Sequence, residues 1–204
     1  MSFAGSALDL FRTRRSIRRY TAQPVPRETV ERLLEAARWA PSAHNRQPWR
    51  FVVVETRGGA SLRLAEAMAA RLRADRLADG DPPEAVEQDV ARSQARLLNA
   101  PVLVLLCLTM AEMDVYPDRR RKKAEFLMGV QSVALAAQNL LLAAHAEGLG
   151  ACWLCAPLFC PDVVRAALDL PPDWEPQALI TLGYPASAGK PANRRELAGS
   201  VIWR

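Results

Sequence analysis

The stretch that decides the fold is residues 101–109, with the sequence PVLVLLCLT. It is apolar at every position before the final threonine, whereas a strand with one face in water alternates apolar and polar side chains. A strand of this composition is covered on both faces, as in a sheet flanked by helices. We therefore expect residues 101–109 to form a central strand.

Other apolar segments on both sides of this strand supply the rest of the sheet and its cover. We expect further strands at residues 51–55 (FVVVE), 149–154 and 177–184 (QALITLGY). Apolar side chains at helical spacing predict helices, of which the longest is polar in its first turn and then apolar on nearly every side. The expected helices are 28–39, 60–76, 83–98, 121–147 and 162–168.

The longest apolar run, residues 126–144, is long enough to raise the question of a membrane span. It contains Gln131, Gln138 and Asn139. Burying each of these amides in lipid without a hydrogen-bond partner would cost on the order of several kcal/mol. We expect a buried helix of a soluble protein and no membrane partner. With 204 residues, half of them apolar, and no internal repeat, the chain is expected to be one domain spanning residues 1–204.

The four cysteines, Cys107, Cys152, Cys155 and Cys160, are too few to staple a fold of this size. The Cys152/Cys155 pair has redox or zinc spacing, but the chain has no second such pair and only two histidines. We therefore expect no metal, although a redox or zinc role is the alternative. The start of the chain lacks the pattern of a secretion signal, so we expect a cytoplasmic protein.

The net charge of +5 is unevenly distributed. Residues 1–50 carry ten arginines against four acidic residues, whereas the remaining 154 residues carry 17 basic and 18 acidic side chains. A local excess suits one bound phosphate better than a long polyanion. We predict no nucleic-acid partner, with a basic face near the N-terminus as the alternative.

Two segments have the composition of a ligand site. Residues 14–20 (RRSIRRY) would place Arg14, Ser16 and Arg18 on one side of an extended strand, where guanidinium and hydroxyl groups could converge on a phosphate. Residues 40–49 (APSAHNRQPW) join a helix to a strand and carry the amides of Asn45 and Gln47, which suit the polar edge of a heteroaromatic ring. The alternative for each segment is an ordinary solvated turn.

The order and spacing of these two segments resemble the nitroreductase family. The similarity continues through APVLV, QNLLLAAHAEGLG and LITLGYP, and so covers nearly the whole chain. It implies an α+β three-layer sandwich, with a central mixed, mostly antiparallel sheet flanked by helices. It also implies a homodimer that exchanges C-terminal arms of about residues 186–204, with FMN bound at each of two interface sites. Turnover in that family is a ping-pong transfer of hydride from NADH or NADPH through flavin N5.

The resemblance assigns roles to particular residues. Arg14, Ser16 and Arg18 would hold the phosphate and ribityl chain of FMN, and Arg15 would contact the polar edge of the ring. The partner subunit would supply the loop containing Pro41, Ser42, Ala43 and Asn45. The remaining cofactor-binding candidates are Ser132 on the long helix, the strand end formed by Trp153, Leu154 and Cys155, and the basic residues Lys190 and Arg194 of the arm.

The segment Cys155-Ala156-Pro157 departs from the family pattern, in which many members have an acidic residue and a glycine beside flavin N5. The surrounding sequence is similar to the C-terminal reductase domain of the bifunctional deazaflavin-coenzyme gamma-glutamyl ligase. We expect no catalytic side chain, because the flavin carries the redox chemistry and the protein orients it, with Trp153 and Cys155 as candidates to line the site.

Three functions remain in competition at this point. The first is an FMN-dependent NAD(P)H oxidoreductase acting on a small electron-poor acceptor such as a nitroaromatic or a quinone. The second is a reductase of a dehydro precursor in deazaflavin-coenzyme biosynthesis. The third is a flavin- or nucleotide-binding module without turnover. The motifs GxSxG, GxGxxG and HExxH are absent, which argues against hydrolase and dinucleotide-fold alternatives.

Overall fold

The computed structural model describes residues 6–204, apart from the side chain of Arg57. Four strands form one antiparallel sheet in the order β1-β2-β4-β3, flanked by helices on both faces. The order along the chain is α1 (Ala7–Thr13), α2 (Arg27–Arg38), η1 (Ala43–Asn45), β1 (Trp49–Glu55), η2 (Thr56–Gly58), α3 (Ala60–Ala78), α4 (Pro83–Leu98), β2 (Val102–Leu108), α5 (Arg119–Ala146), β3 (Gly150–Leu154), η3 (Ala156–Phe159), α6 (Pro161–Leu168), β4 (Glu175–Gly183) and η4 (Leu197–Ser200).

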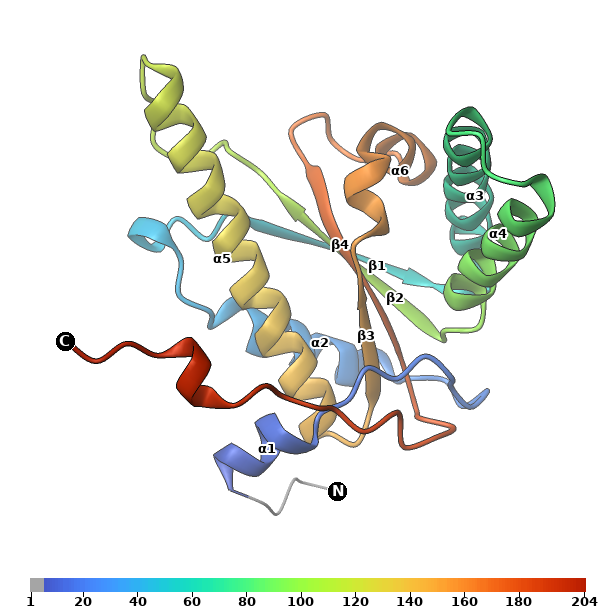
Figure 1. Cartoon of the computed structure of the whole chain (residues 1–204), viewed down its shortest axis with the longest axis horizontal. Helices are drawn as coiled ribbons and strands as arrows, with labels where there is room; N and C mark the ends of the chain where they lie inside the picture. The colour runs from blue at the N-terminus through green and yellow to red at the C-terminus, as the bar shows by residue number, and fades with distance from the viewer. Residues whose placement is uncertain (1–5) are drawn as a thin grey trace.

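The sheet lies between two helical layers (Figure 1). One face packs against α2 and α5, and the other packs against α3 and α6, with α4 covering α3. Strand β2 is buried along its whole length because it is central and alternate side chains enter the two cores. These observations confirm the predicted α+β sandwich and the central position of residues 101–109.

Helix α5 is the spine of one layer. It is the one helix within residues 6–204 that is long and apolar enough to cross a membrane by composition. Its buried residues pack on the sheet and on α2, and a β-carbon at Gly129 would lie 2.9 Å from Leu108 Cδ1 of β2. This close packing agrees with the predicted core helix.

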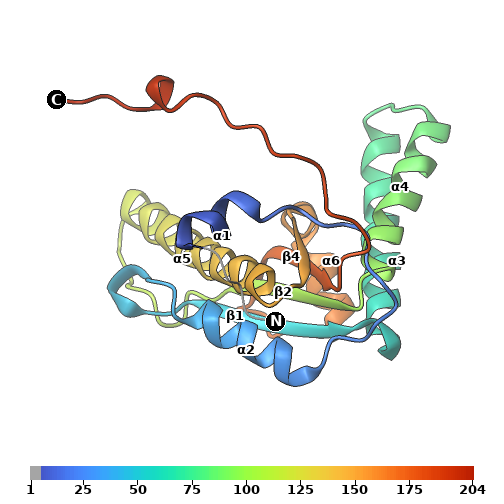
Figure 2. The same ribbon diagram turned by 90° about the horizontal axis from the view of Figure 1, so that it is seen from below.

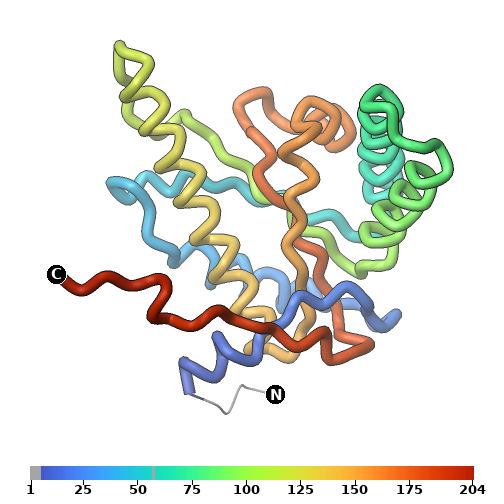
Figure 3. Tube along the Cα trace, viewed as in Figure 1, coloured from blue at the N-terminus to red at the C-terminus, as the bar shows by residue number. Residues whose placement is uncertain are grey.

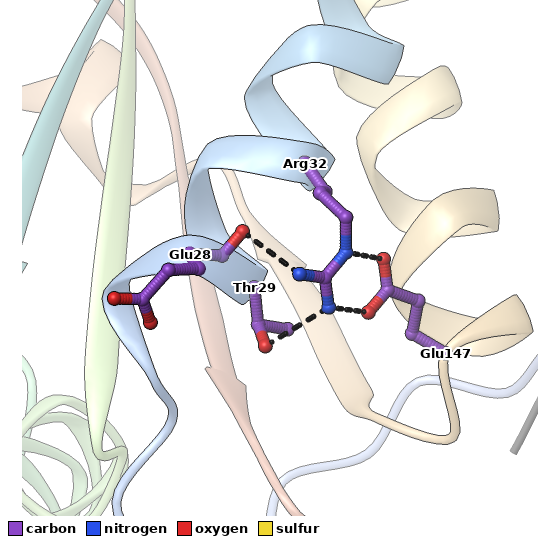
Figure 4. A network of polar contacts seen from close by, with 4 residues as sticks. All are labelled: Glu28, Thr29, Arg32 and Glu147. Atoms are coloured by element: carbon purple, nitrogen blue, oxygen red, sulfur yellow. Dashed lines mark hydrogen bonds and ion pairs between the residues drawn. The ribbon is translucent and has the colours of Figure 1, made fainter.

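A forked ion pair ties α2 to the C-terminal end of α5 (Figure 4). Arg32 donates from Nε to Glu147 Oε1 at 2.9 Å and from Nη2 to Oε2 at 2.5 Å, and it also donates to Thr29 and to the carbonyl of Glu28. Hydrogen bonding by Arg32 is the main cause that lowers the pKa of the Glu147 carboxyl below its usual value. The contact fixes the turn by which α5 leads into β3.

The C-terminal residues leave the sandwich after β4. The arm first passes the N-terminal segment (Figure 3). A β-carbon at Gly189 would lie 2.9 Å from Arg15 Cβ. It then projects away from the body of the molecule (Figure 2). Leu197, Ile202 and Trp203 are exposed by 73%, 79% and 91%. A single chain therefore leaves these apolar side chains of the arm in water. That the arm packs on a second copy, by exchange of arms in a homodimer, stays a prediction.

Candidate functional site

The basic segment after α1 is fixed to the exposed edge of β3. Ser16 forms a parallel bridge with Ala151, and the backbone N–H of Ile17 donates to Ala151 O at 3.0 Å. This isolated bridge lies outside the four named strands and is the only parallel pairing within residues 6–204; the four-stranded sheet itself is antiparallel throughout. Gly150 allows the close approach, because a β-carbon there would lie 2.6 Å from Ile17 Cγ2.

Tyr20 holds the far end of the same segment. Its hydroxyl donates to Ile17 O at 2.6 Å and lies 2.7 Å from Thr181 Oγ1 on β4. Burial raises the pKa of the Tyr20 phenol well above its usual value, so the group stays protonated and keeps these hydrogen bonds. The backbone of residues 14–20 is thus held at both ends by the sheet.

A cavity of about 230 Å³ opens where this segment, the end of α5 and the start of the arm meet. Its polar lining is cationic or neutral and includes no carboxylate: Arg14, Arg15, His145, Thr13 and Ser187. Thr13 Oγ1 lies 2.8 Å from His145 Nε2. Burial first, and then the charges of Arg14 and Arg15, lower the pKa of His145. We name this space the arginine cavity; its chemistry suits a phosphate.

The structure places the predicted phosphate residues only partly together. Arg14 and Arg15 line the arginine cavity, whereas Ser16 and Arg18 are not among its lining residues. Arg15 directs one guanidinium nitrogen to the carbonyl oxygens of Arg12 and Arg14, at 2.5 and 2.8 Å. Arg18 reaches back to the carbonyl oxygen of Ser16 at 3.5 Å.

The loop after α2 has an unusual backbone. His44, Asn45 and Gln47 have φ of 49°, 55° and 51°, a left-handed conformation that costs non-glycine residues energy. Strained loops of this kind are concentrated at functional sites. The conformation is held by hydrogen bonds from Ala43 N to Ser132 Oγ at 3.3 Å and from Gln47 N to Ser42 Oγ at 3.0 Å.

A second cavity, of about 240 Å³, lies between this loop and the middle of α5. It is lined by Pro41, Ser42, Ala43, Met128, Gln131, Ser132 and Leu135. We name it the loop cavity. It brings together four of the predicted residues, Pro41, Ser42, Ala43 and Ser132, whereas Asn45 lies outside its lining and accepts a hydrogen bond from Gln47 Nε2 at 3.3 Å. The Ser132 hydroxyl also donates to Met128 O at 2.7 Å.

The end of β3 presents the third group of candidates. Trp153 packs with the α5 core and Leu154 with the α6 core, since neighbouring side chains on a strand point to opposite faces. Trp153 Nε1 donates to Cys155 Sγ at 3.1 Å, and Cys155 is the one exposed cysteine. The other thiols are free and buried, and burial raises the pKa of Cys107 to about 12. No cluster of metal-binding side chains occurs within residues 6–204.

The two predicted arm residues stay apart from the arginine cavity within one chain. Lys190 and Arg194 are exposed, and Arg194 donates only to the neighbouring Asn193 O, at 2.9 Å. The sequence alone did not indicate Thr13, His145 or Ser187 as cavity residues. His145 follows the lining residue Leu141 by four positions on α5, so the two share one face of the helix. This spacing was the one sequence signal that could have placed His145 at the cavity.

The fold and these cavities define an α+β sandwich with a small-ligand site suited to an anionic group. The chain belongs to the nitroreductase family: the family model described as "Nitroreductase family" matches residues 11–184. The chain is 34% identical over 215 residues to an NADH dehydrogenase of Thermus thermophilus, covering 94% of this chain and 92% of that relative. It is 33% identical over 192 residues to 5,6-dimethylbenzimidazole synthase of Rhodospirillum rubrum, covering 90% and 84%.

Solved structures show the same similarity. A nitroreductase of Desulfovibrio desulfuricans in complex with FMN has a TM-score of 0.76 and 31% identity, and the match covers 99% of this chain and 98% of that one. An FMN- and NADPH-dependent nitroreductase of Sphingopyxis also has a TM-score of 0.76, over 98% and 99% of the two chains; at 22% identity it supports the fold alone. The class of this protein is therefore an oxidoreductase of the nitroreductase type.

Proposed function

We propose that the protein is an FMN-dependent oxidoreductase that oxidises NADH or NADPH and reduces a small electron-poor acceptor, such as a nitroaromatic or a quinone. The observation that carries the proposal is the position of the arginine cavity beside β3, whose C-terminal end presents Trp153 and Cys155. A nucleotide with its phosphate in this cavity could extend along the strand toward that end.

The residues present fit FMN. Two guanidinium groups and the hydroxyl of Ser187 supply donors to a space with no carboxylate, as a phosphate monoester requires. The Thr13 hydroxyl also lines this space, but its proton is donated to Asp9 O at 2.6 Å. Arg14 and Arg15 would hold the phosphate, while Ser16 and Arg18 would contact the ribityl chain and the ring. When bound, FMN supplies the two-electron chemistry that links the reductant to the acceptor.

The protein's own contribution is to bind and orient the cofactor and to shield it from water. Trp153 offers an apolar surface whose indole is held by its hydrogen bond to Cys155. No carboxylate lines either cavity, and the lowered pKa of His145 favours its neutral form. This setting agrees with an enzyme that uses no side chain as general acid or base.

We propose that two copies complete each site. Within one chain, the arginine cavity adjoins α5 at Leu141 and His145, whereas the loop cavity adjoins it from Met128 to Leu135. Trp39 is exposed by 75% and Leu135 by 45%, and the arm is exposed as well. A homodimer that exchanges arms would cover these apolar groups. It would also bring Pro41, Ser42, Ala43, Asn45 and Ser132 of one copy, with Lys190 and Arg194, toward the flavin of the other.

The test is spectroscopic. Purified protein should be yellow, with about one flavin per subunit, and NADH or NADPH should bleach it anaerobically until an acceptor restores the colour. Parallel double-reciprocal plots would support the ping-pong order. Colourless protein that cannot be reconstituted with FMN would overturn the proposal, and a flavin that NAD(P)H does not reduce would favour a binding module.

A narrower proposal concerns the acceptor. The sequence Cys155-Ala156-Pro157, with a proline that has no backbone N–H, favours a specialised acceptor such as a dehydro precursor of a deazaflavin coenzyme. Turnover of that precursor, compared with a nitroaromatic, tests this directly. The assay should also measure 5,6-dimethylbenzimidazole, the product named for one relative. All four cysteines are free thiols, which fits the cytoplasmic location that we propose.

A further inference from the structure

A second concentration of positive charge lies at the start of α5, away from the arginine cavity. Residues 119–123 (RRRKK) are five consecutive exposed cations. Arg121 pairs with Asp118 and stacks over the ring of Tyr116, 5.1 Å from its centroid. The other four have no ion pair within residues 6–204. Since the rest of the chain after residue 50 carries 12 basic and 18 acidic side chains, this cluster is a local positive surface.

The cluster opposes the stability of its own helix. The N-terminus of a helix is its positive pole, so cations there are disfavoured, and like charges three or four residues apart repel. The nearby carboxylates do not compensate, because Asp118 pairs with Arg121, Asp114 pairs with Arg46, and Glu125 is buried. An anion bound to the exposed side chains would relieve this repulsion.

The cluster is in line with the loop cavity. Arg121 precedes Met128 by seven residues and Ser132 by eleven, so the three share one face of the helix, and the latter two line the cavity. Eight residues separate Lys123 from the cavity residue Gln131, which is about 12 Å along the axis at 1.5 Å per residue. This half of α5 extends beyond the sheet into open space (Figure 1). An extended dinucleotide with its reactive ring near the cavity would reach the cations.

We propose that residues 119–123 bind the phosphate groups of the nicotinamide dinucleotide and thereby favour NADPH, with its additional 2′-phosphate, over NADH. The inference rests on the proposed function. The side chains form the site, since the backbone N–H groups of Arg121 and Lys122 already bond to Asp118. A small ligand fits better than a polyanion, because the cluster spans little more than one helical turn between exposed apolar Val115 and Leu127.

The test compares two double variants with the same change in net charge. Arg120→Glu/Lys123→Glu reverses two cations of the cluster, and Arg63→Glu/Arg96→Glu reverses two exposed cations on α3 and α4. Steady-state kinetics with one uncharged acceptor give KM for NADPH and for NADH, and calorimetry gives the Kd of NADP⁺. Acidic residues suit a helix N-terminus, so the first variant should fold at least as well as the wild type.

For the cluster variant we expect roughly a tenfold or larger rise in the KM for NADPH and the Kd of NADP⁺, as for lost charge-assisted contacts. The KM for NADH should rise less, flavin content should not change, and the control variant should match the wild type. Equal effects in both variants, or no preference for NADPH in the wild type, would overturn the inference. Absence of flavin or turnover in the wild type would instead count against the proposed function, and the NADP⁺ titration would still test the cluster.

Discussion

A single methyl group added at Gly150 should separate residues 14–20, the segment that carries Arg14 and Arg15, from the sheet. In Gly150→Ala the new β-carbon would lie 2.6 Å from Ile17 Cγ2 and 2.7 Å from Ile17 Cβ. Carbon atoms prefer separations of about 3.5–4.0 Å, so one backbone must move by roughly 1 Å. The β-branched side chain of Ile17 has no free rotamer to relieve the clash, because its own Cβ is one of the contacts.

Two terms set the size of the effect. Overpacking in a close-packed region costs about 1–3 kcal/mol, and the displacement would weaken the 3.0 Å hydrogen bond from Ile17 N to Ala151 O, worth about 0.5–1.5 kcal/mol. Replacing glycine by alanine also stabilises the protein by about 0.4–1 kcal/mol, because it lowers the conformational entropy of the unfolded chain. We expect a net loss of about 1–3 kcal/mol and, because Arg14 and Arg15 move with the segment, a lower flavin content.

The assay is urea unfolding of the variant, together with its flavin-to-protein absorbance ratio. Gly58→Ala is the matched control, since a β-carbon there meets no atom within 4 Å. Ile17→Ala removes two of the three colliding atoms, Cγ2 and Cγ1, and keeps Cβ. The clash is thereby reduced, so the Gly150→Ala/Ile17→Ala double variant should lose less stability than the two single changes added together. If Gly150→Ala matched Gly58→Ala in stability and kept its flavin, the contact between β3 and residues 14–20 would be wrong.

Three further changes test the site and its supports. Arg14→Ala should weaken FMN binding by about 1.5–3 kcal/mol in a flavin fluorescence titration, whereas Arg63→Ala should not. Arg32→Ala should lower the stability at pH 7 only slightly, because Arg32 is 57% exposed and its ion pair is screened by solvent. The pKa of Glu147 is lowered in the folded protein, so the stability contributed by the Arg32–Glu147 pair is present above the ordinary carboxyl pKa. This stability is lost as the pH falls through the pKa of Glu147 in the folded protein. Unfolding of wild type and Arg32→Ala at pH 7 and pH 3 measures the change. His145 also has a lowered pKa, so the unfolded chain binds its proton more readily, and wild-type stability should rise with pH up to about 6.5; thermal unfolding of His145→Gln should lack that rise.

The secondary structure could be predicted from the sequence because its apolar patterns are long. The strand expected at residues 101–109 is Val102–Leu108, and the helix expected at residues 83–98 is Pro83–Leu98. Helix α1 was not among the expected helices. The other errors lie at the ends of elements. β1 begins at Trp49, two residues earlier than predicted, because Trp49 pairs with Leu108 across the sheet. α5 begins at Arg119 because the side chain of Asp118 caps it despite the cations that follow.

The site was predictable where neighbours in the sequence share a cavity, and at Ser132, which the family resemblance implied. Pro41, Ser42 and Ala43 form one continuous loop and do line the loop cavity, joined there by Ser132. The expectation that Arg14, Ser16 and Arg18 face one space assumed a regular strand. The segment forms a single bridge to β3 instead, and alternation over one bridge does not fix where each side chain points.

The sequence by itself determined the class of fold and the family, because apolar periodicity and two motifs in a fixed order are local properties of the chain. Only the tertiary structure decided the strand order β1-β2-β4-β3 and the meeting of Thr13 with His145, which are 132 residues apart. Contacts between residues so far apart in the sequence depend on the tertiary fold of the whole chain, and no local sequence pattern specifies them. The arginine cavity is accordingly a product of topology, built from residues that the sequence keeps far apart.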